Sequence, residues 1–271
     1  MKWRALENFD VTTMTDLWNR SFEDYIVPIN MSEEDFMTRI NTLNLSTKTS
    51  VIAELDDEKV GMMLYGEEEF KGEKTAWIGG MGVIKSMRQH GVGKEILLKT
   101  IELAKDEEVD KLFLEVIEGN ERAIKLYTKM GFTLINKVSV GKIKLTSAYK
   151  KKDFLELKVS AAIENWQRNL EPLETAWQNR LARNYNMYTI LLNKEEVGYL
   201  YWIEESFSLK QLILKEPTQN IVEGVLALLY EKFGEVQVNV GNFNMEQKEY
   251  AFLIQLGMNE NLRQLHMCYN V

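Results

Sequence analysis

Residues Val83–Lys94, which read VIKSMRQHGVGK, join the end of an apolar, strand-like run to the start of a helix through a turn with two glycines. Gly91 and Gly93 lack Cβ atoms, so main-chain amides can approach an anion closely there. The free N–H groups in the first turn of the helix would complete such a site. The stretch therefore predicts a diphosphate-binding turn, although a Gly-x-Gly pair before a helix is also typical of a structural loop or helix cap.

Two nucleotide-binding motifs that contain similar glycines are excluded. The Gly-Lys pair is followed by Glu95, where a Walker loop requires Ser or Thr, and the spacing before it is wrong. The Gly-x-Gly-x-x-Gly pattern of dinucleotide-binding folds does not occur either. A nucleoside-triphosphate enzyme is therefore disfavoured.

The residues around this turn predict an α/β layer. A hairpin is expected from residues 50–55 and 60–65, and a third strand from residues 75–83, with the charged residues Glu67–Lys74 forming a loop between them. Beyond Gly93, apolar residues recur at helical spacing through residue 104, and strand-like residues 111–117 follow. A helix over residues 121–130 ends at Gly131, and extended structure resumes at 132–138. This alternation implies a mixed sheet with at least one parallel pair.

The segment before the hairpin predicts two helices. Asp10 is a suitable N-cap for a helix that runs to Phe22, and Ser32 can start another toward Ile40. Pro28 interrupts the chain between them.

The second half of the chain repeats the plan of the first. Val60-Gly61-Met62 matches Val197-Gly198-Tyr199, and Lys129–Phe132 matches Gln255–Met258. The second copy has no Arg-x-x-Gly-x-Gly turn. We therefore predict two related domains, at residues 1–148 and 149–271, of which the second has lost the anion turn.

Composition narrows the classes of partner. The formal net charge of −8 and the pI near 5.1 disfavour a nucleic-acid partner. With Cys268 as the single cysteine and only His90 and His266, neither a disulfide within the chain nor a Cys/His metal site is expected. No secretion signal and no run of about 18 apolar residues is visible, so a soluble, cytoplasmic protein without a membrane partner is expected.

A second motif follows the anion turn at residues Leu114–Phe132, which read LEVIEGNERAIKLYTKMGF. Together the two motifs resemble the GNAT superfamily of N-acetyltransferases. That family has a cofactor motif Arg/Gln-x-x-Gly-x-Gly/Ala and a later motif Asn-x-x-Ala-x-x-x-Tyr-x-x-x-Gly-Phe, and both match here in order and spacing. The resemblance covers roughly residues 1–140, including Asp24–Pro28, which is similar to the substrate-side region of some members. It implies tandem GNAT-like folds, the second one degenerate.

The resemblance also implies roles for individual residues. Asn120 would contact acetyl-CoA, and Tyr127 would protonate the departing CoA thiolate, because a phenol is still protonated at neutral pH. The alternative for Tyr127 is a core tyrosine one helical turn before Gly131. Lys85 departs from the family pattern, since many members have proline there. The main chain of three strand residues would contact the pantetheine arm: Met81, Gly82 and Val83. The turn would bind the pyrophosphate through Arg88, Gln89, His90, Gly91, Val92, Gly93 and Lys94.

The general base that deprotonates the acceptor amine is not identified by the sequence. Glu115, Glu67, Glu68, Glu69 and Asp24 are candidates, although residues of this kind are more often solvated surface charges. Direct transfer to the amine needs no covalent intermediate, so Cys268 is not required as a nucleophile.

The sequence thus favours an acetyl-CoA-dependent N-acetyltransferase that acts on a primary amine, either a small molecule or a peptide. The alternative is a non-catalytic acyl-CoA-binding or regulatory protein with the same fold. The second copy keeps Asn242 but has Phe252 and Leu253 where the first has Tyr127, so we expect it to shape specificity or assembly. The acceptor and the oligomeric state, including a homo-oligomer, are left open.

Overall fold

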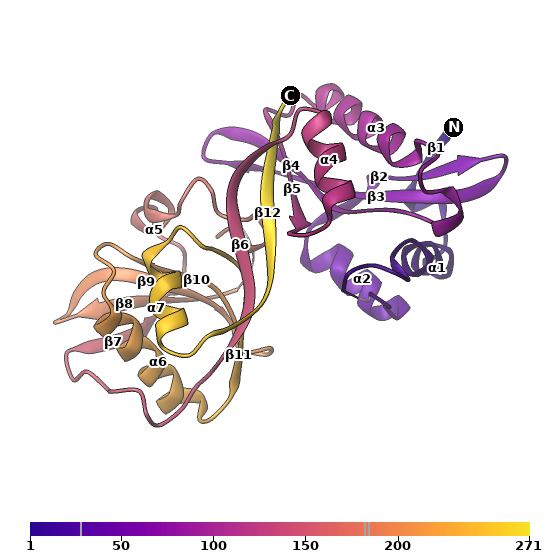
Figure 1. The fold of residues 1–271 in the computed structure, drawn as a ribbon. Helices are drawn as coiled ribbons and strands as arrows, with labels where there is room; N and C mark the ends of the chain where they lie inside the picture. Colours follow the sequence, from indigo (N-terminus) through magenta and orange to yellow (C-terminus); the bar gives the residue numbers. More distant parts are fainter. Residues whose placement is uncertain (28, 182, 184) are drawn as a thin grey trace. The chain divides into compact units, whose positions relative to one another are not determined.

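The computed structural model describes residues 1–27, 29–181, 183 and 185–271, so Pro28 lies outside the described residues. The chain divides into two compact units, each with a mixed α/β architecture (Figure 1). Unit 1 comprises Met1–Thr133 and Met267–Val271, and unit 2 comprises Leu134–His266. The predicted fold class, α/β with a mixed sheet, is confirmed.

The sheet of unit 1 has the strand order β1-β2-β3-β4-β5, and the last residues of β12 follow β5. Neighbouring strands from β1 to β4 are antiparallel, whereas β4 and β5 are parallel, which supplies the predicted parallel pair. The strands are β1 (Lys2–Ala5), β2 (Leu45–Leu55), β3 (Glu58–Phe70), β4 (Glu73–Val83), β5 (Lys111–Ile117) and β12 (Asn259–Asn270).

Helices cover both faces of this sheet, with α1 and α2 on one face and α3 and α4 on the other (Figure 1). The predicted starts are confirmed: the Asp10 carboxylate accepts a hydrogen bond from the Thr13 amide, and Ser32 forms a reciprocal capping box with Asp35. The helices are η1 (Leu6–Asn8), α1 (Val11–Phe22), α2 (Glu33–Thr42), η2 (Lys85–Met87), α3 (Val92–Asp106) and α4 (Glu121–Lys129).

The expected charged loop at Glu67–Lys74 is wrong, because β3 and β4 extend through it as a hairpin. Glu69 lies opposite Lys74, and Phe70 opposite Glu73, so only two residues turn the chain. Those two, Lys71 and Gly72, both have positive φ, as the tightest hairpin turns require. The charges mislead because one face of a hairpin can be solvated while its ladder stays intact.

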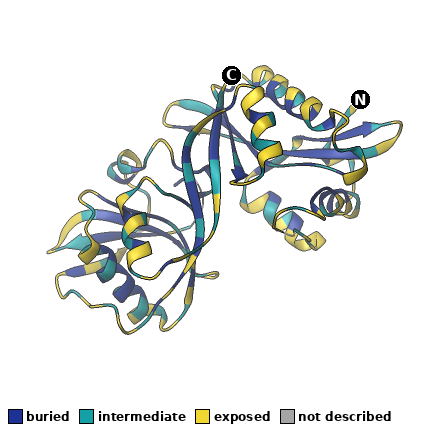
Figure 2. Ribbon diagram, in the orientation of Figure 1, coloured by how far each residue is buried: buried dark blue, intermediate teal, exposed yellow. Residues whose placement is uncertain are grey.

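The last five residues of the chain belong to unit 1. Met267 and Cys268 are buried, and Tyr269 packs its ring against Phe132 at a centroid distance of 5.5 Å. The Val271 amide donates a hydrogen bond to the Asp110 carbonyl. Figure 2 shows β12 as largely buried or intermediate toward this end. Residues far apart in the sequence therefore complete one core.

The sheet of unit 2 has the strand order β12-β6-β11-β10-β9-β8-β7. Of these, β10 and β11 are parallel, whereas β6 with β11, β10 with β9, β9 with β8 and β8 with β7 are antiparallel. The elements are β6 (Thr133–Lys144), β7 (Leu155–Val159), α5 (Asn165–Leu170), η3 (Trp177–Asn179), β8 (Asn186–Leu192), β9 (Glu195–Ile203), β10 (Ser208–Leu214), α6 (Gln219–Phe233), β11 (Gln237–Asn244) and α7 (Lys248–Gln255).

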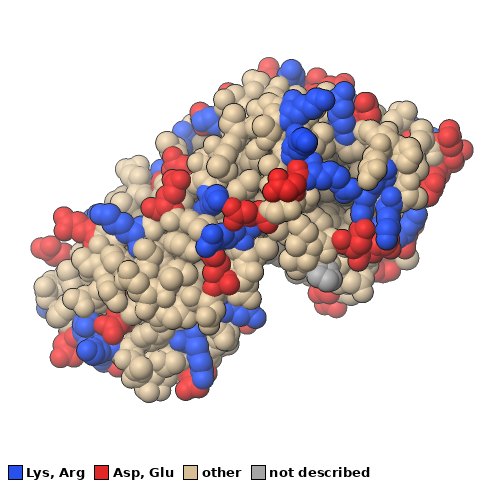
Figure 3. All heavy atoms as spheres, in the orientation of Figure 1, with Lys and Arg blue, Asp and Glu red and all other residues tan. Residues whose placement is uncertain are grey.

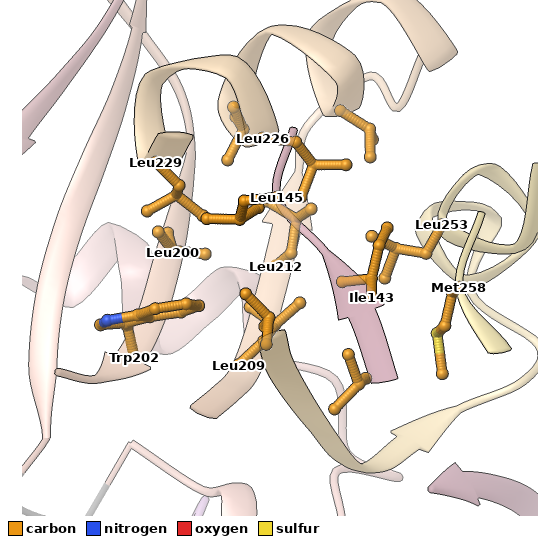
Figure 4. Close-up of a cluster of buried hydrophobic side chains, with 14 of the residues drawn as sticks. Ile143, Leu145, Leu200, Trp202, Leu209, Leu212, Leu226, Leu229, Leu253 and Met258 are labelled. Carbon is orange, nitrogen blue, oxygen red and sulfur yellow. The ribbon is translucent and has the colours of Figure 1, made fainter. Parts of the chain in front are cut away.

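The main core of unit 2 lies between its sheet and α6 and α7. Leu226 and Leu229 of α6 meet Leu200 and Trp202 of β9, while Leu253 of α7 lies over β6 (Figure 4). These side chains are almost completely buried, and each such burial contributes about 1.5–3 kcal/mol. A helix-covered sheet with its own core is thus repeated in the second half of the chain.

Local geometry at the repeated glycines is the same in both units. A Cβ at Gly61 would lie 2.7 Å from the Gly82 carbonyl oxygen, and one at Gly198 would lie 2.2 Å from that of Ile213. Gly131 and Gly257 end α4 and α7 with φ of 97° and 102°. These contacts explain why the sequence repeat is visible at glycines.

A buried histidine makes unit 2 sensitive to acid. His266 is fully buried, and its Nδ1 lies 3.1 Å from the Asn136 Oδ1; burial, together with the nearby Arg180 charge, lowers its pKa to about 3. Because the unfolded value is near 6.5, protonation favours unfolding, so stability is full above about pH 6.5 and falls below it by about 1.4 kcal/mol per pH unit. Urea unfolding from pH 4.5 to 8 should show this slope reduced in His266→Gln. An equal slope in the variant would contradict it.

Within the described residues, no helix has the length and apolar character needed to cross a bilayer. The same residues hold no cluster of three or more His, Cys, Asp or Glu side chains suited to a metal ion.

Candidate active site

The two parallel strands of unit 1 separate in the middle of the sheet. Their pairing extends over three residue pairs, from Thr75 opposite Lys111 to Trp77 opposite Phe113. Beyond this point, the main chain of Met81–Val83 pairs with β3, and its edge toward β5 has no described strand partner. Free N–H and C=O groups along a strand edge can bind an extended ligand as a further strand would.

A bulge in β4 marks the point of separation. Leu64 of β3 faces Gly80, but the next residue, Tyr65, faces Ile78, so Gly79 is the extra residue. Such a bulge bends the strand and re-aims its main-chain groups. The diverging edge of β4 follows directly from it.

The glycines of β4 make room for helix α1. A Cβ at Gly80 would lie 2.5 Å from the Trp18 ring, and one at Gly82 would lie 2.6 Å from the Ser21 side chain. Glycines within a strand indicate a closely approaching backbone or ligand; here the neighbour that requires them is the packed face of α1.

The turn between η2 and α3 presents five consecutive main-chain amides, from Gln89 to Gly93. Within the described chain none of these N–H groups donates a hydrogen bond, whereas the next two amides, of Lys94 and Glu95, both donate to the Gly91 carbonyl. Gln89 and Gly91 have φ of 66° and 84°, which curves the backbone so that successive amides converge. With the positive end of the α3 dipole behind it, the turn has the features that an anion site requires.

Three positive side chains lie on α4, the helix that contacts the start of α3. Leu126 of α4 lies 3.7 Å from where a Cβ of Gly93 would be, so the middle of α4 contacts the start of α3. Arg122, Lys125 and Lys129 belong to α4, and their spacing places them on one side of the helix, flanking Leu126. Figure 3 shows Lys and Arg side chains gathered over α4. A protein with net negative charge thus presents a local positive field beside its anion turn.

The Arg88 side chain points away from the five free amides. Its Nε donates to the Val83 carbonyl, its Nη2 to the Ser21 carbonyl, and its Nη1 to the Asp24 carboxylate at 2.5 Å. The hydrogen bond from Arg88, followed by the charges of Arg88 and Lys85, lowers the pKa of Asp24. The guanidinium therefore joins the end of β4 to the end of α1.

Asn120 stands at the start of α4 and has two contacts. Its Oδ1 accepts from the Ala123 amide and caps the helix, while its Nδ2 lies 3.5 Å from the Tyr25 hydroxyl. Tyr25 follows α1, and its ring meets Phe22 edge-on at 5.4 Å. Asn120 is therefore fixed as an N-cap with its amide group directed at the segment after α1.

Tyr127 lies on the same helix, two turns beyond Asn120. The residue is 8% exposed, and its ring packs against Phe132 at 5.9 Å. Burial, and secondarily the nearby Tyr25 phenol, raises its pKa. In the described structure its hydroxyl has no hydrogen-bond partner, although a buried tyrosine hydroxyl normally finds one.

Four of the five candidate bases lie in unsuitable surroundings. Asp24 is held by Arg88 with a lowered pKa, and a carboxylate so stabilised is a weak base. Glu67, Glu68 and Glu69 belong to the hairpin end of β3, opposite residues 74–76 and before the strands diverge; Glu67 also pairs with Lys74.

Glu115 has the best placement among the five. It lies on β5 two residues beyond the last pair with β4. Burial lowers the pKa of Arg39 in α2, and the charge of Glu115 partly opposes this shift. Arg39 in turn donates a hydrogen bond from Nη2 to the carbonyl of the bulge residue Gly79. Glu115 therefore lies near the bulge, on the α2 face of the sheet.

The structure places Asn120 and Tyr127 on one helix, two turns apart, and adds residues that the sequence patterns do not single out. Tyr25 enters the sequence analysis only as part of a substrate-side segment, and Arg39 does not enter it. Neither residue belongs to a motif, and their proximity depends on how α1 and α2 pack on the sheet. His90 is exposed and contacts the Arg88 carbonyl through Nδ1.

Comparison with known proteins agrees with this arrangement. Residues 3–132, which contain the diverging strands, the anion turn and Tyr127, match the acetyltransferase (GNAT) family. This region belongs to that family. The resemblance predicted from the two motifs is thereby confirmed, and the free edge of β4 and the turn at Gln89–Gly93 are features of a GNAT fold in this chain.

A curated relative is N-alpha-acetyltransferase 30 of Dictyostelium discoideum, which is 28% identical over 96 residues. The match covers 35% of this chain and 52% of the relative, so the chain spans about half the length of the curated relative it matches.

Solved structures of GCN5-related N-acetyltransferases share the fold along nearly the whole chain. The protein from Sphaerobacter thermophilus has a TM-score of 0.69 at 12% identity, covering 99% of this chain and 95% of its own. The protein from Anabaena variabilis has a TM-score of 0.60 at 12% identity, covering 98% and 72%. At these identities the likeness concerns the fold.

Proposed function

We propose that unit 1 is an N-acetyltransferase that moves the acetyl group of acetyl-CoA to a primary amine. The observation that carries this proposal is the hydroxyl of Tyr127, which has no described hydrogen-bond partner although the residue is only 8% exposed, and which belongs to the helix that Asn120 caps. The five free amides from Gln89 to Gly93 would hold the pyrophosphate. The free edge formed by Met81, Gly82 and Val83 would pair with the pantetheine arm.

The reaction is a direct displacement at the thioester. The amine nitrogen attacks the thioester carbonyl carbon, a C–N bond forms, and the C–S bond then breaks to release CoA as a thiolate. Tyr127 donates its proton to the thiolate, and the amine loses a proton to a base or to solvent. Because burial raises the pKa of Tyr127, the phenol stays protonated throughout the neutral range.

Lys94 and the main chain of His90 are assigned to the same pyrophosphate site, whereas the Arg88 amide donates to the Lys85 carbonyl and is not free for it. Lys94 lies in the first turn of α3, where its ammonium can screen a diphosphate. The amides would orient the phosphate oxygens through hydrogen bonds, and the lysine would neutralise part of their negative charge. Both roles suit a ligand with several anionic oxygens.

We further propose that unit 2 is a degenerate copy of the same fold. Its parallel pair β10–β11 diverges after two residue pairs, and β10 has an irregularity between Leu209 and Gln211, as β4 has at Gly79. The Lys210 amine lies 3.9 Å from where a Cβ of Gly241 would be, so a side chain reaches from β10 to β11. With Leu253 preceding Gly257 where Tyr127 precedes Gly131, unit 2 lacks the proposed acid.

A coupled thiol-release assay tests the enzymatic proposal. The protein is incubated with acetyl-CoA and, in turn, small primary amines, amino acids and peptides with free N-termini, and CoA thiol is measured. Amine-dependent release supports the proposal. Tight binding of acetyl-CoA without release for any amine would instead favour the non-catalytic acyl-CoA-binding protein.

A further inference from the structure

Arg88 is part of the anion-turn motif, yet each of its three guanidinium nitrogens is bonded to a protein acceptor outside the turn. Two of those acceptors, the Ser21 carbonyl and the Asp24 carboxylate, lie at the end of α1. The third is the Val83 carbonyl, at the end of β4. We call these three hydrogen bonds the Arg88 clamp. Arg88 is only partly exposed, and a bond between a guanidinium and a carboxylate is among the stronger side-chain contacts.

The clamp holds the end of α1 and so affects the position of Tyr25, the residue after Asp24. The Tyr25 amide donates to the Phe22 carbonyl, and the two rings meet edge-on, so the orientation of Tyr25 depends on the end of α1. From there the Tyr25 hydroxyl reaches the Asn120 Nδ2. Its only described polar contact is thus to a residue of the proposed acetyl-CoA site.

Tyr25 and Tyr127 approach the same place from different elements of the fold. Tyr25 contacts Asn120, the N-cap residue of the helix that carries Tyr127, and the Tyr25 phenol adds to the effect of burial in raising the pKa of Tyr127. Burial also raises the pKa of Tyr25, so both hydroxyls remain protonated and able to donate. Two preorganised donors are better suited than one to a group that becomes negatively charged during reaction.

We propose that Tyr25 is a second hydrogen-bond donor to the thioester as it gains negative charge, and that Arg88, through Asp24, is the positioning residue that holds Tyr25 there. This rests on the proposed acetyl transfer. The Arg88 side chain then serves the transfer step, while pyrophosphate binding is left to the turn amides and Lys94.

The test compares four single variants and one double variant with the wild type in both binding and turnover. Tyr25→Phe removes the donor, Arg88→Gln removes the clamp, Asp24→Asn removes the negative charge that Arg88 contacts, and Lys94→Gln is the control that removes a cation beside the same turn. Affinity for acetyl-CoA is measured by calorimetry, and kcat is measured with the amine that gives the fastest thiol release. Hydrogen exchange of the main-chain amides of residues 19–27 measures whether the clamp holds the end of α1, and it needs no amine substrate.

We expect Tyr25→Phe to lower kcat by about 10²-fold, and both clamp variants to lower it by roughly 10- to 10²-fold. Their Kd for acetyl-CoA should change less than about threefold. The double variant Asp24→Asn/Arg88→Gln should be no worse than Arg88→Gln alone, because that substitution already removes all three hydrogen bonds of the clamp. Exchange of residues 19–27 should rise in both clamp variants. Lys94→Gln should show the reverse: weaker acetyl-CoA binding with normal exchange at residues 19–27.

Three results would overturn the inference. Loss of acetyl-CoA affinity in Arg88→Gln but not in Asp24→Asn would make Arg88 a phosphate ligand. Unchanged kcat in Tyr25→Phe would remove Tyr25 from the reaction. Unchanged hydrogen exchange of residues 19–27 in both clamp variants would show that the clamp does not hold the end of α1. If the wild type itself releases no thiol with any amine, the proposed transfer fails, and the exchange data still decide whether the clamp exists.

Discussion

Replacing Tyr127 with phenylalanine is expected to lower kcat for thiol release by about 10²- to 10⁴-fold, the usual contribution of a positioned general acid. The ring would keep its packing against Phe132, because only the hydroxyl is removed. That hydroxyl has no described partner to lose, so stability should change little. The Kd for acetyl-CoA should stay within about threefold of the wild-type value, since the phenol acts on the departing thiolate.

Tyr65 offers a matched control for this substitution. It is also a buried tyrosine of unit 1, its hydroxyl has no hydrogen-bond partner in the described chain, and burial raises its pKa. Its position on β3 opposite Ile78 precedes the diverging edge of β4. Tyr65→Phe should therefore leave kcat unchanged. Equal kcat in wild type and Tyr127→Phe would show that Tyr127 is a core tyrosine and that the thiolate is protonated by another group.

Deleting residues 267–271 is expected to destabilise unit 1 by about 2–5 kcal/mol. Burial of the Met267 side chain is worth about 1.5–3 kcal/mol, and the ring contact of Tyr269 with Phe132 adds about 0.5–1.5 kcal/mol. The loss should appear as faster hydrogen exchange in β5 and α4, with lower acetyl-CoA affinity as its consequence.

The control for this deletion is removal of Val271 alone, which takes away one main-chain hydrogen bond to Asp110. Exchange in β8 and β9 serves as an internal reference, since those strands belong to unit 2. If β5 and α4 stay as protected as in the full chain, the final strand contributes nothing to unit 1.

Much of the fold follows from local patterns. The helix starts at Asp10 and Ser32, the hairpin between β2 and β3, and the end of α4 at Gly131 depend on capping, turn and periodicity rules that act over a few residues. The extended hairpin at Glu67–Lys74 escapes these rules because its charges mark a solvated face and not a break in the ladder.

The site is predictable where motifs specify main-chain geometry and less so where it depends on packing. The glycine at position 91 predicts a turn that leaves main-chain amides free, and the structure confirms a left-handed φ of 84° there, a conformation that favours glycine. The direction of the Arg88 side chain and the approach of Tyr25 depend on the end of α1, which is distant in the sequence. Likewise, no pattern indicates that Met267–Val271 joins unit 1, and the division at residues 148 and 149 stays a prediction.

Calorimetric titration with acetyl-CoA tests the central claim most directly, using Gly91→Ala and its matched control Gly72→Ala. Gly91 and Gly72 have φ of 84° and 83°, and a Cβ added at either would meet no atom within 4 Å. The backbone strain of the two substitutions is therefore matched, and only Gly91 lies in the anion turn. We predict saturable binding at one site per chain, weakened in Gly91→Ala and unchanged in Gly72→Ala. No binding by the wild type, or equal weakening in both variants, would contradict a cofactor site at Gln89–Gly93.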